Sequence, residues 1–275
     1  LGEVRHVAID GKTVRRSLDT KHQQKPIHLV SAWADEASLL LGQGKTPEKS
    51  NEITAIPELL DLVSIRGTVV TIDAMGCQKA IAEKIQKQGG EYVLALKANQ
   101  GNIHQQVVEF FEEEKAVLAS QSDLVRYIGD EEQAHGRVES RHWYAHKPPS
   151  WMPEALQWPG LKSIAMVEHE RLIDRELKIE RRYYLSSLAP NAREIAQRVR
   201  QHWGIENRLH WTLDVLFRED DSRKRAGHSA QNFAFFRRFV LNLLRQDTTK
   251  GLSLRRKRLK AGWDNSYLEK ILGVE

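Results

Sequence analysis

Three acidic residues stand where carboxylates from separate structural elements could meet. Asp10 ends a strand-like run at residues 3–10, and Asp73 ends a β-branched run at residues 67–73. Glu206 lies in a third element of a different kind, whose apolar spacing predicts a helix. A charge directly after a buried strand must be paired or bound to a cation. The three acids therefore indicate a site for a divalent metal.

The predicted helix covers residues 198–225 and has two contrasting faces. Four polar residues recur every fourth position, which places them on one face: His202, Glu206, His210 and Asp214. Apolar residues with the same period form the opposite face: Ile205, Leu209, Leu213 and Leu216. We expect the apolar face to pack on the core and to hold Glu206 toward the two strand ends.

Such a trio of acids suits phosphodiester chemistry. Two divalent cations about 3.5–4 Å apart activate a water or a 3′-hydroxyl and stabilise the leaving oxygen. Mg²⁺ and Mn²⁺ prefer carboxylate oxygens. We therefore predict that Asp10, Asp73 and Glu206 bind two Mg²⁺ or Mn²⁺ ions and cut and join DNA strands.

Ordinary structural roles remain open for these acids. Asp10 precedes Gly11 and could be a turn residue. Glu206 could be a salt-bridge partner of Arg200 or Arg208.

The histidines offer a rival metal. His202 and His210, with Glu206 between them, could bind zinc, because imidazoles four residues apart share a helix face. The spacing is not the HExxH of the zinc proteases, which favours packing or DNA contact for the histidines.

Charge is distributed unevenly along the chain. The protein has 275 residues and a net charge of +5. Residues 193–275 contain 18 Lys and Arg against 10 Asp and Glu, a net +8. This asymmetry favours an anionic partner such as nucleic acid for the C-terminal third. The single cysteine, Cys77, excludes an internal disulfide and is expected to be a small packing residue.

The order of the predicted elements indicates an α/β fold. Strands are expected at residues 3–10, 27–33, 38–42, 67–73 and 91–96, and helices at 51–63, 78–87 and 102–117. No apolar run approaches the roughly 18 residues that span a bilayer. The abrupt start at Leu1 suggests a fragment that lacks an N-terminal segment.

A change of pattern near residue 120 predicts three regions. Residues 1–119 would be the first part of a catalytic domain, 120–190 a β-rich insertion, and 191–275 the part that completes the catalytic domain. Alternating strands are predicted within the insertion at 137–144, 162–167 and 178–185. A helix is predicted at 229–245, with Phe233, Phe236, Val240, Leu243 and Leu244 inward, followed by a basic tail at 254–260.

Five motifs in order resemble one known family. They are AIDGK at Asp10, TIDAMGCQ at Asp73, LKANQG at Lys97, HGRVESR at His135, and HWGIENRLHWTLDVLFREDDSR at Glu206. Over nearly the whole chain, this pattern resembles the H-repeat-associated insertion-sequence transposases of bacteria, which are DDE transposases.

The resemblance implies a ribonuclease-H-like mixed sheet flanked by helices, with the β-rich insertion before the last catalytic helix. It implies that Asp10, Asp73 and Glu206 are the metal-binding triad, with Mg²⁺ or Mn²⁺ as cofactor. It also implies a cytoplasmic protein that joins the nucleoid when bound to DNA, works on element ends and target DNA, and forms a homodimer there. A hydrolysis-only nuclease and a non-catalytic DNA-binding protein are the alternatives.

DNA contacts are expected around the three acids. The candidates are Lys97, Asn99, His202, Asn207, His210, Arg223 and Arg225, with His135, Arg137 and Arg141 as further possibilities in the insertion. Related transposases carry a tyrosine, arginine and lysine around the glutamate, whereas this chain has Val199, His202 and Leu213 at those positions. We expect His202, Asn207, His210 and Asp214 to take over some of those contacts.

Overall fold

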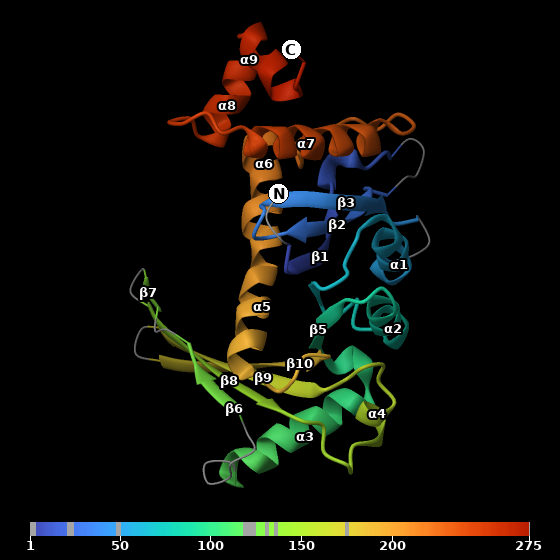
Figure 1. Ribbon diagram of the computed structural model, residues 1–275, viewed down its shortest axis with the longest axis vertical. Coiled ribbons are helices and arrows are strands. Elements are labelled where there is room, and N and C mark those ends of the chain that lie inside the picture. Colours follow the sequence, from blue (N-terminus) through green and yellow to red (C-terminus); the bar gives the residue numbers. More distant parts are fainter. Residues whose placement is uncertain are drawn as a thin grey trace.

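A computed structural model describes residues 4–20, 25–47, 51–117, 125–129, 132–134, 137–173 and 176–274. The strands in these ranges form one mixed sheet in the order β3-β2-β1-β4-β5-β10-β9-β8-β6, and β7 pairs with β8. Helices lie along the sheet (Figure 1), and the protein therefore has the mixed α/β architecture that the sequence predicts.

The first five strands follow the predicted order. They are β1 (His6–Thr13), β2 (His28–Ala34), β3 (Leu39–Lys45), β4 (Val69–Ile72) and β5 (Glu91–Leu96). Strands β1, β2 and β3 are antiparallel, and β4 lies parallel between β1 and β5. Asp10 is not at the end of β1, because β2 pairs with β1 as far as Thr13. The parallel pairing with β4 stops at Ile9, and Asp10 therefore lies where that neighbour ends.

Helices on one face of the sheet enclose the main core. They are α1 (Glu52–Leu62), α2 (Lys79–Lys87), α3 (Asn102–Val117) and the short α4 (Pro153–Leu156). Two single 3-10 turns lie in connections between elements: η1 (Arg15–Ser17) between β1 and β2, and η2 (Ala98–Gln100) between β5 and α3. The Asn51 side chain caps α1 by accepting a hydrogen bond from Ile53 N. Cys77 packs in this core and is fully buried.

The predicted helix at 198–225 proves shorter and irregular. It consists of α5 (Ala192–Gly204), a π-helical turn η3 (Ile205–His210) and α6 (Trp211–Phe217), which together run beside the sheet as one long column (Figure 1). Arg218 adopts a left-handed conformation, φ 49° and ψ 46°, which ends the helix. Three of the four residues of the predicted apolar face, Ile205, Leu209 and Leu213, are fully buried against β1 and β2, whereas Leu216 is half-buried.

The region predicted as an insertion extends the same sheet. Its strands are β6 (Val125–Ile128), β7 (Glu132–Ala134), β8 (Arg137–His146), β9 (Ser163–Ile173) and β10 (Glu176–Ser186). Strand β10 pairs antiparallel with β5 through residues 183–186. Strands β6 and β7 were not predicted, and His135 and Gly136 lie outside the described residues. The division into a catalytic domain and an insertion stays a prediction.

The C-terminal helices correct one sequence prediction. They are α7 (Ser229–Gln246), α8 (Leu254–Ala261), which forms from the basic tail, and α9 (Asn265–Leu272). Phe233, Phe236 and Val240 of α7 were predicted inward but are exposed. The residues that α7 buries are Ala230, Ala234, Arg238, Leu241 and Leu244. Arg238 lies on the buried face because it pairs with the buried Glu219, which turns the phenylalanines outward.

No helix within the described ranges combines the length and the apolar character needed to span a lipid bilayer.

Candidate metal centre

The alternation of side chains along β1 directs Asp10 toward the helical column. Side chains of a strand point to opposite faces in turn. Val7 and Ile9 enter the main core, whereas Ala8 packs with Ile205 and Leu209 of the column. Asp10 has the parity of Ala8 and therefore faces the column.

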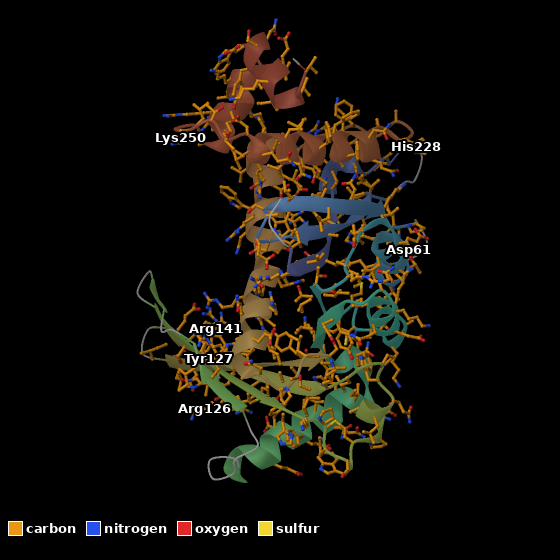
Figure 2. The ribbon with its side chains drawn as sticks, viewed as in Figure 1. Asp61, Arg126, Tyr127, Arg141, His228 and Lys250 are labelled. Atoms are coloured by element: carbon orange, nitrogen blue, oxygen red, sulfur yellow. The ribbon has the colours of Figure 1, made fainter. Side chains whose placement is uncertain are left out.

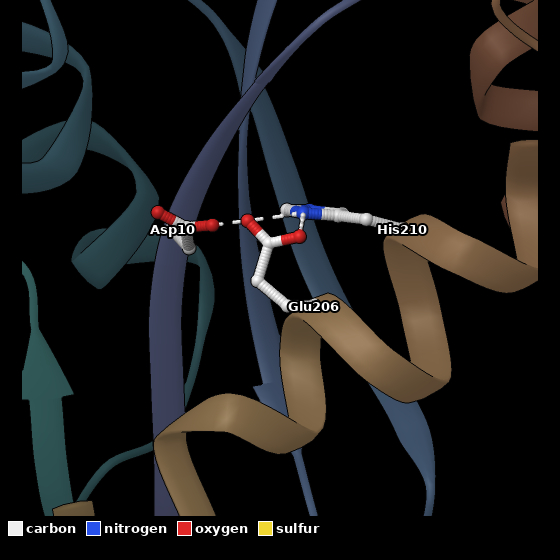
Figure 3. Close-up of side chains that lie close together, drawn as sticks. All are labelled: Asp10, Glu206 and His210. Carbon is white, nitrogen blue, oxygen red and sulfur yellow. Dashed lines mark ion pairs between the residues drawn. The ribbon is translucent and has the colours of Figure 1, made fainter. Parts of the chain in front are cut away.

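The column brings Glu206 to Asp10. One ligand atom each from Asp10, Glu206 and His210 lies within 4.8 Å of the others. His210 Nδ1 is 3.6 Å from an Asp10 carboxylate oxygen and 3.5 Å from a Glu206 oxygen (Figure 3). The His210 side chain is buried, whereas the Glu206 side chain is 52% exposed. Glu206 therefore presents carboxylate oxygen to the solvent side of the group.

Asp73 lies beside this group, in the same cavity. The cavity has a volume of about 460 Å³, and Asp10, Asp73 and Glu206 all line it. One Asp73 oxygen accepts hydrogen bonds from the backbone N–H groups of Met75 (3.0 Å) and Gly76 (3.3 Å). These bonds fix the orientation of the Asp73 carboxylate at the end of β4.

The electrostatics of the cavity suit a cation. Burial, followed by the charges of Glu206 and Asp73, raises the pKa of Asp10 to about 8. Burial and the charge of Glu52 raise the pKa of Asp73. A hydrogen bond with His210 lowers the pKa of Glu206. Two carboxyl groups with raised pKa values lie beside Glu206, whose pKa is lowered, and together they form an oxygen-rich donor set that fits a hard divalent cation.

Two contacts hold the column close to the strands. A Cβ atom on Gly204 would lie 1.9 Å from Asp35 Oδ1, so the absence of a side chain permits this close approach. Lys12 Nζ donates to Asp214 Oδ2 at 2.8 Å and to Asp220 Oδ1 at 3.2 Å. These contacts join β1 to α6 and to the segment after it, and they fix Glu206 opposite Asp10.

Two cationic side chains line the same cavity. Lys97 follows β5, and Arg182 belongs to the part of β10 that extends beyond its pairing with β5 and donates from Nε to Glu180 at 2.8 Å. The neighbouring Arg181 points to the other face of the strand, where it pairs with Glu112 of α3 and with Glu168. The Arg182 guanidinium lies 5.7 Å from the ring centre of Trp203, which is 48% exposed. The cavity thus combines an acidic side with a basic and aromatic side.

A second hollow of about 310 Å³ continues from the first. The two share Arg182, Tyr184, Val199 and Trp203. Arg141, His169, Arg200 and Asn207 are among the other lining residues. Figure 2 shows Arg141 and Tyr127 on the side of the strands that faces α5, with Arg126 on the other side. A basic surface therefore leads away from the acids between α5 and β8–β10.

The candidate DNA contacts occupy different places. Lys97 and His202 line the first hollow, and Asn207 lines the second. Asn99 Nδ2 donates to Ala74 O at 2.9 Å and so supports the loop after Asp73. Arg223 and Arg225 are exposed in the segment between α6 and α7.

His202, Glu206 and His210, the three residues considered as zinc ligands, do not form one cluster of possible ligands. His202 Nδ1 lies 2.9 Å from Thr71 Oγ1, and Asp10 rather than His202 joins Glu206 and His210. This geometry favours a carboxylate-dominated centre over the zinc alternative.

Sequence reasoning missed several residues of the site. Glu52 of α1 raises the pKa of both strand aspartates and hydrogen-bonds to His28 at 2.6 Å. Trp203 and Arg182 also line the cavity, and the sequence pattern did not mark either as a site residue. The pairing of β10 with β5 brings Arg182 into the lining of the cavity that contains the acids.

The fold and the cavity define a mixed α/β protein with a cluster of acidic side chains that could hold a metal ion. The chain belongs to the family described as "Transposase DDE domain", whose model matches residues 2–243. It is 43% identical over 271 residues to the "H repeat-associated putative transposase YhhI" of Escherichia coli K12, covering 97% of this chain and 71% of that one. The "Putative protein YbfL" of the same strain is similar to the same extent. The "H repeat-associated putative transposase YbfD" is 47% identical over 135 residues, covering 49% of this chain and 52% of that one. The predicted family is confirmed.

Proposed function

We propose that this protein is a DDE-type DNA transposase of a bacterial insertion sequence. Asp10, Asp73 and Glu206 would hold two Mg²⁺ or Mn²⁺ ions. The observation that carries the proposal is the shared cavity, where these acids meet from β1, the end of β4 and the helical column. We further propose that strands β1–β5 with α1, α2 and α5 are the ribonuclease-H-like unit, which β6–β10 extend.

The residues of the cavity would have separate roles in strand cleavage and strand transfer. Divalent ions, when bound, activate water or a 3′-hydroxyl and stabilise the leaving oxygen. Asp73 is oriented by two backbone N–H groups, and Glu206 is kept ionised by His210. Lys97 and Arg182 line the same cavity, where they would attract and orient the phosphodiester.

DNA is the proposed partner, and its path would follow the basic hollow between α5 and β8–β10. Arg182, Arg141 and Asn207 would contact the backbone there, and Trp203 would contact a base. Arg223 and Arg225 would add phosphate contacts after α6. Because two element ends must be joined, we propose a homodimer in the DNA complex, acting in the cytoplasm on the nucleoid.

An Asp73→Ala variant tests the proposal. The wild-type protein, DNA carrying the flanks of its own reading frame and Mn²⁺ should give nicked and joined products. Asp73→Ala should lose both products by at least about 100-fold while binding DNA as the wild type does. Asp61→Ala is the matched control, because Asp61 is an exposed acid on α1 (Figure 2) and should change neither. Undiminished cleavage by Asp73→Ala would remove this residue from the mechanism.

The products also separate the alternatives. Nicks without joined strands would indicate a nuclease that only hydrolyses. A gel shift without any cleavage by the wild type would indicate a DNA-binding protein that lacks catalysis.

A further inference from the structure

A chain of hydrogen bonds lies directly behind the acids. His6 Nε2 is 2.8 Å from the Thr71 hydroxyl oxygen, and the same oxygen is 2.9 Å from His202 Nδ1. His6 and Thr71 are 0% and 2% exposed. Polar groups this deeply buried cost free energy unless they are hydrogen-bonded, so the chain forms a defined connection.

Each of the three residues precedes one of the acids in the same part of the chain. His6 precedes Asp10 by four positions, and both lie on β1. Thr71 lies in β4 and precedes Asp73, the first residue after that strand, by two positions. Even spacing along a strand keeps both pairs on the face toward the column. His202 precedes Glu206 by four, the spacing of one helical turn. Each element that supplies an acid therefore also supplies one member of the chain.

Both imidazoles in the chain are neutral. Burial lowers the pKa of His6 to about 3 and that of His202 to about 4. A neutral imidazole carries one N–H, and its position depends on the partner of each ring nitrogen. The Thr71 hydroxyl has one hydrogen and two acceptor lone pairs. Among the described residues its only hydrogen-bond partners are the two imidazoles, so it donates to one histidine and accepts from the other. Two arrangements are therefore available.

The surroundings of His6 select between them. His6 Nδ1 is buried and has no hydrogen-bond partner among the described residues. A buried donor left without a partner is rarer than a buried acceptor left without one. His6 therefore carries its hydrogen on Nε2 and donates to Thr71. Thr71 in turn donates to His202 Nδ1, which leaves the hydrogen of His202 on Nε2.

We infer that His6 and Thr71 are positioning residues that hold His202 as a neutral imidazole with its Nε2–H available to the cavity, where it donates to a phosphodiester oxygen. His202 lines the cavity that contains the three acids. An uncharged donor stabilises an anionic oxygen without adding a positive charge that would compete with a cation for the carboxylates. The tautomer follows from the chain alone, whereas the phosphodiester contact rests on the proposed function.

Nitrogen NMR of the whole protein tests the tautomer without DNA or metal. Histidine labelled with ¹⁵N distinguishes a protonated from an unprotonated ring nitrogen, and a His202→Gln sample assigns the signals. The wild type and Thr71→Ser should show His202 with the hydrogen on Nε2. Thr71→Val, which removes both hydrogen bonds at nearly constant volume, should show a mixture. A wild-type His202 with its hydrogen on Nδ1, or a tautomer unaffected by Thr71→Val, would overturn the inference.

Cleavage assays test the contact with the phosphodiester. Thr71→Val should slow Mn²⁺-dependent nicking about tenfold, and Thr71→Ser should restore it. Thr68→Val is the control, because the buried Thr68 hydroxyl donates to Ile65 O at 2.8 Å on the other side of β4 and should not affect nicking. Unchanged nicking by Thr71→Val, with the tautomer lost, would overturn the contact. A wild type that does not cleave refutes the proposed function instead and leaves the NMR result standing.

Discussion

Arg238 and Glu219 form a bidentate ion pair in which both side chains are completely buried. Their nitrogen–oxygen distances are 2.5 Å and 3.1 Å, and Arg238 also donates to Ala234 O at 3.1 Å. The pair joins α7 to the segment that follows α6. Since α6 continues the turn that carries Glu206, the pair also limits movement of the helical column.

Removal of one partner should destabilise the protein strongly. Glu219→Ala leaves the Arg238 charge buried without its carboxylate, and we expect the free energy of unfolding to fall by about 3–5 kcal/mol in urea denaturation. The double variant Glu219→Leu/Arg238→Met should recover most of this loss, because it buries no charge. Glu83→Ala, which breaks an exposed pair with Lys87, should change stability by less than about 1 kcal/mol. An equal loss for Glu83→Ala and Glu219→Ala would contradict this account.

The ion pair also shows where sequence reasoning stops. Hydrophobicity alone places Phe233 and Phe236 inside, but the buried face of α7 depends on Glu219. Glu219 is buried because the column ends at Arg218 in a left-handed turn, which no glycine in the sequence signals. The irregular turn at residues 205–210 likewise results from packing on β1 and from the close approach at Gly204. These features depend on tertiary contacts that local patterns do not encode.

Other parts of the molecule follow from the sequence directly. The β-branched run before Asp73 predicts a buried parallel strand, because such residues fill a sheet covered on both faces. Four-residue spacing from Ile205 predicts the buried face of the column. The sequence predicted that Asp10 and Asp73 would meet at strand ends, and both line one cavity although Asp10 lies within β1. The basic wall at Arg182 was not predictable, because it requires the pairing of strands far apart in the chain.

The raised pKa of Asp10 predicts an unusual dependence of stability on pH. A carboxyl whose pKa is about 8 in the folded state and 3.8 in the unfolded state stabilises the fold below pH 4, and this contribution is lost as the pH rises through 8. Relative to Asp10→Asn, the metal-free wild type should therefore lose stability between pH 4 and pH 8. The comparison with this variant is needed because the lowered pKa values of the buried His6 and His202 make both proteins more stable as the pH rises toward 6.5. At pH 8, Asp10→Asn should have the higher free energy of unfolding, by on the order of 5 kcal/mol.

Added Mg²⁺ should stabilise the wild type at pH 8 far more than Asp10→Asn, because metal binding requires the ionised carboxylate. Asp61→Asn serves as the control and should retain the wild-type slope. Thermal unfolding with a chelator and with Mg²⁺ measures both effects. A stability difference between Asp10→Asn and the wild type that does not grow from pH 4 to pH 8 without metal would contradict the assignment of Asp10.

Gly204→Ala should weaken metal binding from a distance. The added Cβ would meet the carboxylate of Asp35, which is buried and held by Trp33 Nε1 at 3.2 Å. The column must then move outward, and Glu206 moves with it. We expect Mn²⁺ affinity, measured by calorimetry, to fall about 10–100-fold. Gly44→Ala, where an added Cβ meets nothing within 4 Å, should leave the affinity unchanged.

Arg182→Ala tests the DNA path between α5 and β8–β10. Each phosphate contact contributes about 0.9 to the slope of log affinity against log salt concentration. Arg182→Ala should therefore weaken binding of DNA of any sequence and reduce this slope by about one. Trp203→Ala should also weaken binding but leave the slope unchanged, because stacking on a base releases no counterion. Lys87→Ala, on α2 across the sheet, should alter neither quantity. If Arg182→Ala keeps the wild-type slope, DNA does not cross this hollow, and the basic wall serves only to balance the acids of the cavity.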